Sequence, residues 1–403
     1  MISLSFADDF ALPPSLQMQE AQLSARAHRA EITAVQAAVR AAQARPAIVS
    51  GLEDPMLSPS LDHKPLEGMG QNTSITIEQR FPLSGVRGYR RAGAKAEADR
   101  TQAVADKTTL DIDLDVASAY LMLRKERQMQ RILTEQTELA ASVVKSANAR
   151  YAAGNGSQAE VLRAETEHAR LHAKLATSLA NVASAEVMFN TSIGRDSTLA
   201  VPTLSPDTMR LVTQSGLPKE EAVASALRLR PELSGGKAES RRAAADVKVM
   251  ESMYKPMATV RAGMADTMAE GKGYMLMVGI SLPIWRSRLQ AGVAEAKAME
   301  SMTHADVDAM QRMIAGETAA AWETHRGSVL RYQSLRDDVL PRATRTMPSA
   351  LAAYADNRLA LTGVLESAQA LWMVQMELVD AEYEAGLSWS RLHRAMGDTG
   401  AMP

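Results

Sequence analysis

The chain has 403 residues and a formal net charge of −2, from 45 basic and 47 acidic side chains, so the sequence indicates no nucleic-acid partner. Cysteine is absent, which excludes disulfides, thiol catalysis and zinc–thiolate sites. Aromatic residues are only 4% of the total, and this composition favours long helices over a thick globular core.

The first element is an N-terminal segment, residues 1–20, that we expect to be extended. Its opening residues, MISLSFADDFALPPSLQ, lack the basic region of a secretory signal, so we expect no signal peptide in this chain. Nowhere do about 18 apolar residues run together, as a membrane-spanning helix would need. Strands that span a membrane are shorter and alternate in polarity, so a membrane location stays open.

A first repeat, residues 21–193, begins with a helix and continues with two predicted strands, at about 46–61 and about 72–83. In the second strand Ile75 and Ile77 alternate with polar residues. Period-two alternation over about ten residues is typical of a strand with one apolar and one polar face, as in membrane β-barrels. The first strand alternates poorly and contains two prolines.

A long helical hairpin, at about 90–193, completes the first repeat. Residues 94–153 contain neither glycine nor proline, and as a single helix they would span about 90 Å. Gly154, Asn155 and Gly156 tolerate positive φ, so we predict the turn of the hairpin there.

Residues 194–230 are predicted to connect this repeat to a second one with the same order of elements. The second repeat covers residues 231–385. Its strands and its helical hairpin are predicted at about 256–268, about 274–284 and about 288–385. Residues 386–403 then form a C-terminal segment.

The two hairpin turns carry one motif twice. In YAAGNGSQAEVLRA (151–164) ten residues separate Tyr151 from Val161, and in YADNRLALTGVLESA (354–368) ten residues separate Tyr354 from Val364. We therefore interpret the chain as an internal duplication.

Two prolines in each half support the duplication, but the two matched pairs are separated by different numbers of residues. Pro46 matches Pro256 at an offset of 210 residues, and Pro82 matches Pro283 at an offset of 201. These offsets predict that the first half is longer by nine residues between the two points.

The four predicted strands imply oligomerisation if they lie in a membrane. Four strands cannot close a barrel, and an open sheet cannot sit in lipid with unpaired edges. Three chains would supply twelve strands, which is enough for closure. The membrane interpretation therefore predicts a homotrimer.

Four stretches resemble the TolC-like outer-membrane factor family, the exit ducts of tripartite efflux pumps and of type I secretion. They are RPEL at 230–233, SLPIW at 281–285 and the two turn motifs at 151–164 and 354–368. The resemblance covers residues from about 15 to 396, with strands and turns in the expected order. Within the family the chain looks most like the branch that serves heavy-metal efflux.

The resemblance implies a mainly α-helical chain with a membrane β-barrel part, assembled as a trimeric duct in the outer membrane and periplasm. Each chain would supply two repeats of helix, strand, strand, long helix, turn and helix, and the trimer a twelve-stranded barrel. The duct would be passive and not an enzyme, without cofactors. Its partners would be a periplasmic adaptor (membrane fusion) protein, an inner-membrane RND-type pump and outer-membrane lipid.

The resemblance also implies roles for the hairpin turns. The family often places acidic residues beside the Val-Leu pairs to line a periplasmic entrance. Here those positions are Glu160, Arg163, Gly363 and Glu366, so only two of the four are acidic. The adaptor would dock on the turn residues, namely Gly154, Asn155, Gly156, Asn357 and Arg358.

Aromatic residues where strands meet helices are candidates for the membrane interface, and we predict this position for Phe81, Tyr254 and Trp285.

Two groups of residues are weak candidates for metal binding. Glu165, His168 and His172 fall on one helix face, a spacing related to the Glu-x-x-His pattern of di-iron bundles, although polar residues on a solvated face explain them equally well. The thioethers of Met257, Met275 and Met277, on the predicted polar strand face, suit Cu(I), whereas methionine is more often an apolar filler.

The cargo implied by the resemblance is a heavy-metal cation, copper or silver or else cobalt, zinc or cadmium. A duct for drugs or for type I protein secretion is the nearer alternative. A soluble helical scaffold or metal-binding protein is the alternative from another class. The four predicted alternating strands argue against it, because such a protein does not need them.

Overall fold

The computed structural model describes residues 12–13, 15–62, 72–205, 217–267, 270–356 and 358–398. The chain divides into two compact units. The first, which we call the hairpin unit, consists of Met1–Thr33, Lys107–Arg230 and Met313–Pro403. The second, which we call the sheet unit, consists of Ala34–Asp106 and Pro231–Arg312. Both halves of the sequence therefore contribute to each unit.

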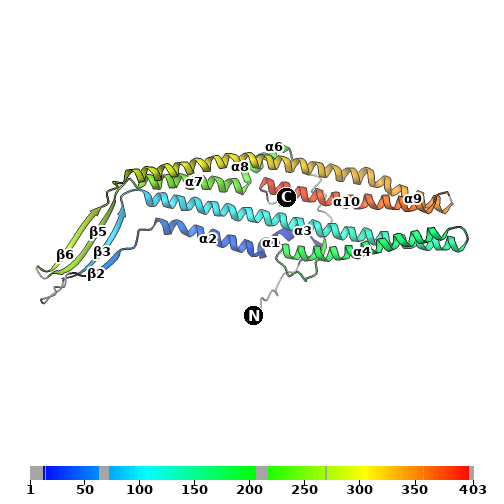
Figure 1. The fold of residues 1–403 in the computed structure, drawn as a ribbon, viewed down its shortest axis with the longest axis horizontal. Helices are drawn as coiled ribbons and strands as arrows, with labels where there is room; N and C mark the ends of the chain where they lie inside the picture. The colour runs from blue at the N-terminus through cyan, green and yellow to red at the C-terminus, as the bar shows by residue number, and fades with distance from the viewer. Residues whose placement is uncertain are drawn as a thin grey trace. The chain divides into compact units, whose positions relative to one another are not determined.

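The sheet unit contains a four-stranded antiparallel sheet with the strand order β2-β3-β5-β6 (Figure 1). Its strands are β2 (Met56–Asp62), β3 (Asn72–Pro82), β5 (Met257–Thr267) and β6 (Gly271–Ile280). Ile77, Ala262 and Leu276 stand in register on one face. On the other face Arg261 donates from Nε to Glu78 Oε2 at 3.0 Å. The four predicted strands and their two-faced character are confirmed.

The strand predicted at about 46–61 is wrong in its first ten residues. Helix α2 (Ala30–Ser50) continues through Pro46, and β2 begins only at Met56. The alanine-rich sequence before Pro46 favours a helix, and a single proline removes one hydrogen bond from it without ending it here.

The strand predicted at about 274–284 lies instead at Gly271–Ile280. Ser281 still donates its N–H to the Met257 carbonyl at 2.9 Å, but Pro283 has no N–H with which to continue the ladder. Residue 268, the predicted end of the neighbouring strand, lies outside the described residues.

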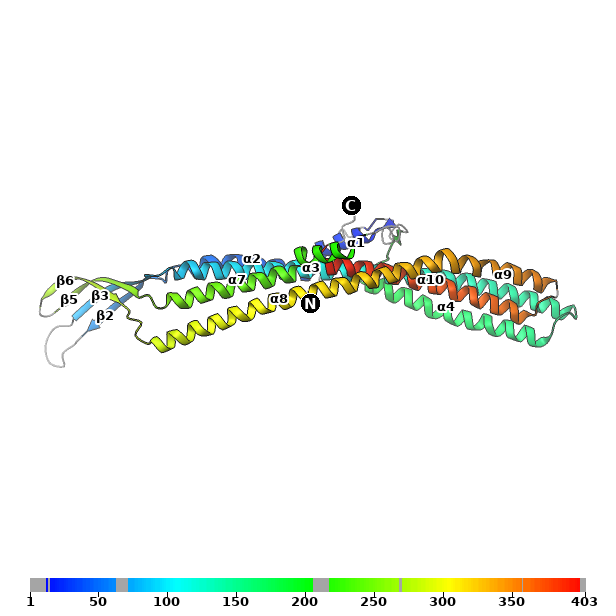
Figure 2. The same cartoon turned by 90° about the horizontal axis from the view of Figure 1, so that it is seen from above.

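The hairpin unit contains two helical hairpins whose long outgoing helices, α3 and α8, begin in the sheet unit. The first hairpin consists of α3 (Val86–Ala152) and α4 (Gln158–Ser192). The second consists of α8 (Arg286–Ser334), the π-helical turn η1 (Leu335–Val339), α9 (Leu340–Ala355) and α10 (Leu361–Met396). Helices α9 and α10 lie side by side (Figures 1 and 2). The π-helical turn ends two residues before Pro341, whose ring is incompatible with a regular helix interior.

Each repeat starts with a short helix that the sequence analysis did not separate from the next one. Helices α1 (Met18–His28) and α6 (Lys219–Leu229) both have 11 residues and end where the backbone becomes extended. The break falls at Arg29 in the first repeat and at Arg230 in the second, and α2 and α7 (Pro231–Ser252) follow.

These breaks correct the predicted alignment of the two halves. Arg29 and Arg230 are 201 residues apart, as are Met56 and Met257, the first residues of β2 and β5. The predicted match of Pro46 with a proline 210 residues later is therefore wrong. The repeats keep a single offset from the first helix to the strands, without the nine-residue insertion.

The predicted end segments also contain regular structure. In the segment predicted as 1–20, β1 (Ser15–Leu16) pairs in parallel with β4 (Thr203–Leu204), and α1 begins. The connecting segment predicted as 194–230 contains β4 and α6, with 206–216 outside the described residues.

Helix α10 extends through most of the segment predicted as 386–403. The small residues there serve close packing: an added Cβ at Gly386 would meet Leu121 Cδ2 at 2.9 Å. The Ser388 and Ser390 hydroxyls are buried and donate to carbonyls in the preceding turn, at 3.0 and 3.1 Å. Glycine and serine were therefore misleading signals for a loop.

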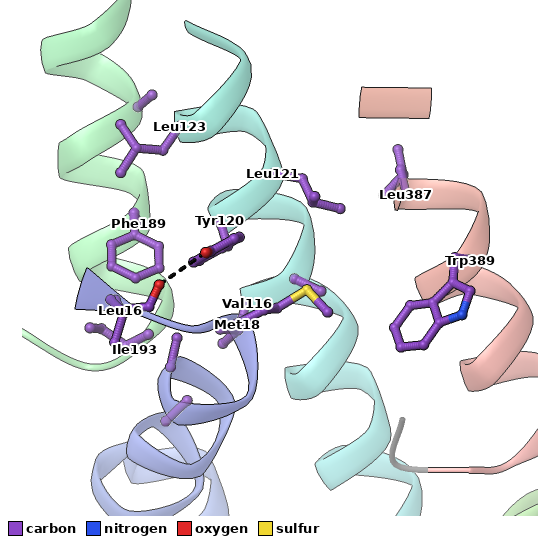
Figure 3. Packing of buried hydrophobic residues seen from close by; sticks show 14 of the residues in the cluster. Leu16, Met18, Val116, Tyr120, Leu121, Leu123, Phe189, Ile193, Leu387 and Trp389 are labelled. Atoms are coloured by element: carbon purple, nitrogen blue, oxygen red, sulfur yellow. Dashed lines mark hydrogen bonds between the residues drawn. The ribbon is translucent and has the colours of Figure 1, made fainter. Parts of the chain in front are cut away.

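The largest buried side chains of the hairpin unit gather around Tyr120, Phe189 and Leu16, which are all fully buried (Figure 3). The Tyr120 hydroxyl donates to the Leu16 carbonyl at 3.0 Å, and its ring meets Phe189 edge to face at 6.3 Å. This cluster fixes the N-terminal strand against α3 and α4.

Among the described residues, no helix has both the length and the apolar character needed to cross a lipid bilayer.

Candidate functional site

The turn of the first hairpin is a tight helix end of the kind that glycine permits. Gly154 has φ of +74°, and its N–H donates to the Tyr151 carbonyl at 3.0 Å. The Asn155 N–H donates to the Arg150 carbonyl at 2.9 Å. These two bonds form a Schellman motif. The next helix starts at Ser157, whose hydroxyl accepts the Glu160 N–H at 3.3 Å.

One arginine links this turn to the second hairpin. The Arg150 guanidinium lies 4.4 Å above the centre of the Tyr354 ring and donates to the Tyr354 carbonyl at 3.3 Å. It also donates to the Asn155 carbonyl at 3.3 Å. Such a cation–π contact is worth about 0.5–2 kcal/mol, depending on how far it is desolvated. Both turns are therefore held by the same side chain.

The duplicated tyrosines lie in different environments. Tyr354 is 8% exposed and Tyr151 is 50% exposed. The Tyr354 hydroxyl is buried and has no hydrogen-bond partner among the described residues, and this burial raises the pKa of Tyr354 above its ordinary value. Nearby Arg150 acts in the opposite direction, while Glu160 adds to the increase.

The duplicated valines meet in one core. Val161 and Val364 are buried in a single hydrophobic cluster that also contains Leu171, Leu361 and Trp372. Sequence spacing predicts that the pairs lie one turn inside the returning helices, and they do. Burial of the valines positions the residues beside them on both hairpins.

The four predicted entrance residues flank these valines in the sequences of α4 and α10. Glu160 is half-buried, whereas Arg163 and Glu366 are exposed, and none of them forms an ion pair among the described residues. Gly363 lies in the first turn of α10, where an added Cβ would approach the Leu359 side chain to 2.7 Å.

The predicted docking residues lie mostly at the surface. Gly154 and Asn155 are exposed, Gly156 is half-buried, and Arg358 is exposed and paired with Asp356. Asn357 lies outside the described residues.

The predicted interfacial aromatics occupy three different settings. Phe81 lies on the apolar sheet face opposite Ala258, Tyr254 is half-buried in the turn after α7, and Trp285 is exposed before α8.

The predicted metal candidates are not assembled into a site. Glu165 and His172 are exposed and His168 is half-buried. No group of three or more histidine, aspartate or glutamate side chains able to hold a metal ion occurs in the described part of the chain.

The three methionines share a sheet face without forming a cluster. Met277 pairs with Arg261 and Met275 with Gly263, whereas Met257 lies at the far end of β5. Met277 lies opposite Arg261, which is four positions along β5 from Met257. Four positions along a strand correspond to about 13 Å between Met257 and the level of Met277.

A cavity that the sequence analysis missed lies in the sheet unit, where the strands meet the helices. Its volume is about 380 Å³, and it is lined by the residues that join α2 to β2, β3 to α3, α7 to β5 and β6 to α8. Its lining includes Arg87, Arg90 and Arg288. The available signal was the repeated cluster of arginines after each strand pair, GVRGYRR at 85–91 and WRSR at 285–288.

The comparisons with known proteins agree with this architecture. Residues 11–195 match the family described as "Outer membrane efflux protein". The chain is 25% identical to the outer membrane efflux protein BepC of Brucella suis over 316 residues, which is 74% of this chain and 67% of BepC. It is 23% identical to the cobalt-zinc-cadmium resistance protein CzcC of Cupriavidus metallidurans over 329 residues, 79% of this chain and 76% of CzcC.

The fold is also similar to the solved structure of CusC, described in connection with transmembrane channel formation. The TM-score is 0.80 at 15% sequence identity, with 98% of this chain and 99% of CusC covered. At this identity the likeness establishes the fold, including the four strands per chain and the two repeats.

Proposed function

We propose that this chain, which belongs to the TolC-like outer-membrane efflux family, assembles as three copies into the passive exit duct of a tripartite efflux system. It is an outer-membrane channel protein that extends into the periplasm and not an enzyme. The duct carries no energy source of its own. An inner-membrane RND-type pump drives the transport, and a periplasmic adaptor protein connects the pump to the duct.

The observation that supports a trimer is that the four-stranded sheet is open at both edges. Within the part of the chain that the structure describes, strands β2 and β6 each have a neighbour on one side only, so each presents a row of unpaired backbone groups. Lipid cannot satisfy such groups. Pairing β2 of one copy with β6 of the next closes a barrel of twelve strands, in which every backbone edge has a partner.

The exposed side chains support the same closure. Tyr274, Leu276 and Val278 of β6 are 66–90% exposed, although they are large and apolar. Solvent exposure of such a row is costly, whereas contact with lipid hydrocarbon is favourable. The opposite face, with Glu78 and Arg261, then lines the duct.

The hairpin turns supply the periplasmic entrance in this proposal. Glu160 and Glu366 contribute two carboxylates per chain beside the buried valines, and Arg163 weakens their combined negative charge. The adaptor docks on the exposed turns, through Asn155 in the first hairpin and Arg358 in the second.

Heavy-metal cations are the cargo that similarity to a cobalt-zinc-cadmium resistance protein supports. Organic molecules are the second candidate, because the basic cavity of the sheet unit repels cations. Growth of a strain lacking its own exit duct, in the presence of copper, zinc or an organic dye, separates the two classes.

The duct itself is tested by expressing the chain behind a secretion signal and separating the inner and outer membranes. We expect the protein in the outer membrane, with the mass of a trimer in detergent, and ion conductance in a planar bilayer. A monodisperse monomer or dimer that needs no detergent would contradict the proposal.

A further inference from the structure

The cavity of the sheet unit has a strongly uneven charge. Among the described residues, its lining contains one carboxylate, Glu53, and five basic side chains, which are Arg80, Arg87, Arg90, Lys255 and Arg288. The chain as a whole is nearly neutral, with a net charge of −2, so this concentration of positive charge is local. Like charges at such short range are unfavourable unless something neutralises them.

The protein itself neutralises little of this charge. Arg80 lies near Glu78, with 3.3 Å from Nε to Oε1, and Arg87 donates to the Ser50 carbonyl at 2.8 Å. Arg90, Lys255 and Arg288 have neither an ion pair nor a hydrogen bond from their side chains within the described residues. Three cationic groups are therefore available to a ligand.

The two helices that start at the cavity carry basic and not acidic residues in their first turns. Helices α1, α2, α4, α6 and α7 carry an acidic residue in the first turn, as the helix dipole favours. Among the described helices, α3, α8, α9 and α10 have no acid there, and in α3 and α8, the two that start at the cavity, Arg87 and Arg288 occupy the first turn. Two positive helix ends and their arginines thus converge on one space, which favours an anion between them.

The wall also contains large apolar side chains. Leu52, Leu282 and Trp285 line the cavity, and Leu282 and Trp285 are 75% and 71% exposed. A volume of about 380 Å³ is in the range of small-molecule sites, which combine apolar walls with a few polar groups. The wall fits a ligand with an acidic head and an apolar body.

The cavity opens on the polar face of the sheet. Arg80 lies two residues from Glu78 on β3, so both point to the face that also carries Arg261. The apolar face with Ile77 and Phe81 is the opposite one. In the proposed duct the cavity therefore faces the lumen and not the lipid, and this places Trp285 in the lumen instead of at the membrane interface expected from the sequence.

We propose that this cavity binds an amphiphilic organic anion in the lumen of the duct, and that organic anions belong to its cargo. The inference rests on the proposed duct and adds a substrate class to it. Arg90 and Arg288 contact the acidic head, and Trp285 packs against the apolar body. Three copies of the cavity would surround one passage.

A matched pair of variants tests the site in lipid nanodiscs and planar bilayers. The first is R90Q/R288Q, which removes two cavity charges without breaking a hydrogen bond or an ion pair among the described residues. The control is R91Q/R286Q, on the same two helices, because Arg91 and Arg286 are exposed and do not line the cavity. Both variants lose two positive charges.

The probe is 11-bromoundecanoate, whose bromine quenches tryptophan fluorescence. We expect it to block conductance and to quench Trp285, with the W285F variant as the blank. The concentration for half block should rise about tenfold in R90Q/R288Q, as expected for two partly exposed ion pairs, and should not change in R91Q/R286Q. The alcohol 11-bromoundecanol should act only at higher concentration.

Three results would overturn the site. The first is equal block of both variants by the acid. The second is equal block by the acid and the alcohol, which would indicate that the probe inserts from the lipid. The third is a conducting duct whose conductance the acid does not block and whose Trp285 fluorescence it does not quench. Conductance without any probe reports on the proposed duct separately. Quenching reports on the cavity even in a preparation that does not conduct.

Discussion

Gly194 and Gly397 occupy the same place in the two repeats, 203 residues apart. Each ends the returning helix of its hairpin with φ of +76° and faces the backbone break between the two short helices that start its own repeat. An added Cβ at Gly397 would lie 2.8 Å from Arg230 N, and at Gly194 it would lie 3.4 Å from the His28 carbonyl group. The end of each repeat is thus packed on its beginning.

This relationship predicts a graded response to alanine. Gly154→Ala introduces only the left-handed backbone, which costs about 1–2 kcal/mol, because no atom lies within 4 Å of the new Cβ. Gly194→Ala should cost about the same, since its contacts are of ordinary length. Gly397→Ala adds a backbone overlap of about 1–3 kcal/mol.

The measurement is the thermal stability of the purified protein, with far-UV circular dichroism at the same time. The expected order of destabilisation is Gly397 greater than Gly194, with Gly194 close to Gly154. Equal losses at Gly154 and Gly397 would show that the contact with Arg230 adds nothing to the backbone strain.

The contact between Arg150 and Tyr354 predicts opposite results for two conservative changes. Tyr354→Phe removes a buried hydroxyl that has no partner, so stability should be unchanged or slightly higher. Arg150→Gln removes the cation above the ring and should loosen the turns. Hydrogen exchange of residues 151–158 measures the effect, and faster exchange is expected in Arg150→Gln alone. Unchanged exchange in both variants would mean that the arginine does not hold the turns.

Charge reversal at the entrance tests the proposed role of Glu366. Glu366→Lys should lower the preference of the channel for cations, because an exposed carboxylate beside Val364 is replaced by an ammonium group. The reversal potential across a potassium chloride gradient measures this preference. Glu165→Lys, on the first hairpin and one turn beyond Val161, is the control of equal charge. A Glu366 variant that keeps the preference of the unmodified channel removes this residue from the entrance.

His325 predicts a loss of stability in mild acid. It is 6% exposed and hydrogen-bonded to the Ser388 hydroxyl at 3.2 Å, and burial, together with the charge of His393, lowers its pKa from 6.5 to about 4. The unfolded chain therefore takes up a proton first. The contribution of neutral His325 to the free energy of unfolding is fully present above pH 6.5. It falls by about 3 kcal/mol in total as the pH drops towards 4.

The variant His325→Gln should flatten this dependence between pH 6.5 and 4. Unfolding followed at several pH values checks it, with His172→Gln as the control because His172 is exposed. Unaltered pH dependence in His325→Gln would assign the acid loss to other groups, His393 among them, whose pKa burial also lowers.

Much of the architecture is readable from the sequence because it depends on local rules. Alternation along β3 predicts its two faces, and the absence of glycine and proline predicts the long α3. The turn at Gly154 follows from backbone freedom, and the spacing from Tyr151 to Val161 predicts that the valine lies in the returning helix.

Other features depend on tertiary packing and were misread or missed. Pro46, Gly386, Ser388 and Ser390 are residue types that usually mark helix ends, yet here each lies inside a helix. The break at Arg29 has no glycine or proline to announce it. The basic cavity requires four connections from both halves of the chain to meet, and no single stretch of sequence shows that.

The unequal burial of Tyr151 and Tyr354 bears on stoichiometry. Three chains with two similar hairpins would present six turns around one axis, which approximates sixfold symmetry. Because Arg150 covers one tyrosine of each pair and leaves the other exposed, those six positions form two chemically distinct sets of three. A ring of six identical partner subunits seated on them would have to bind in two alternating ways, and a mutation at Tyr151 would affect every second subunit of that ring.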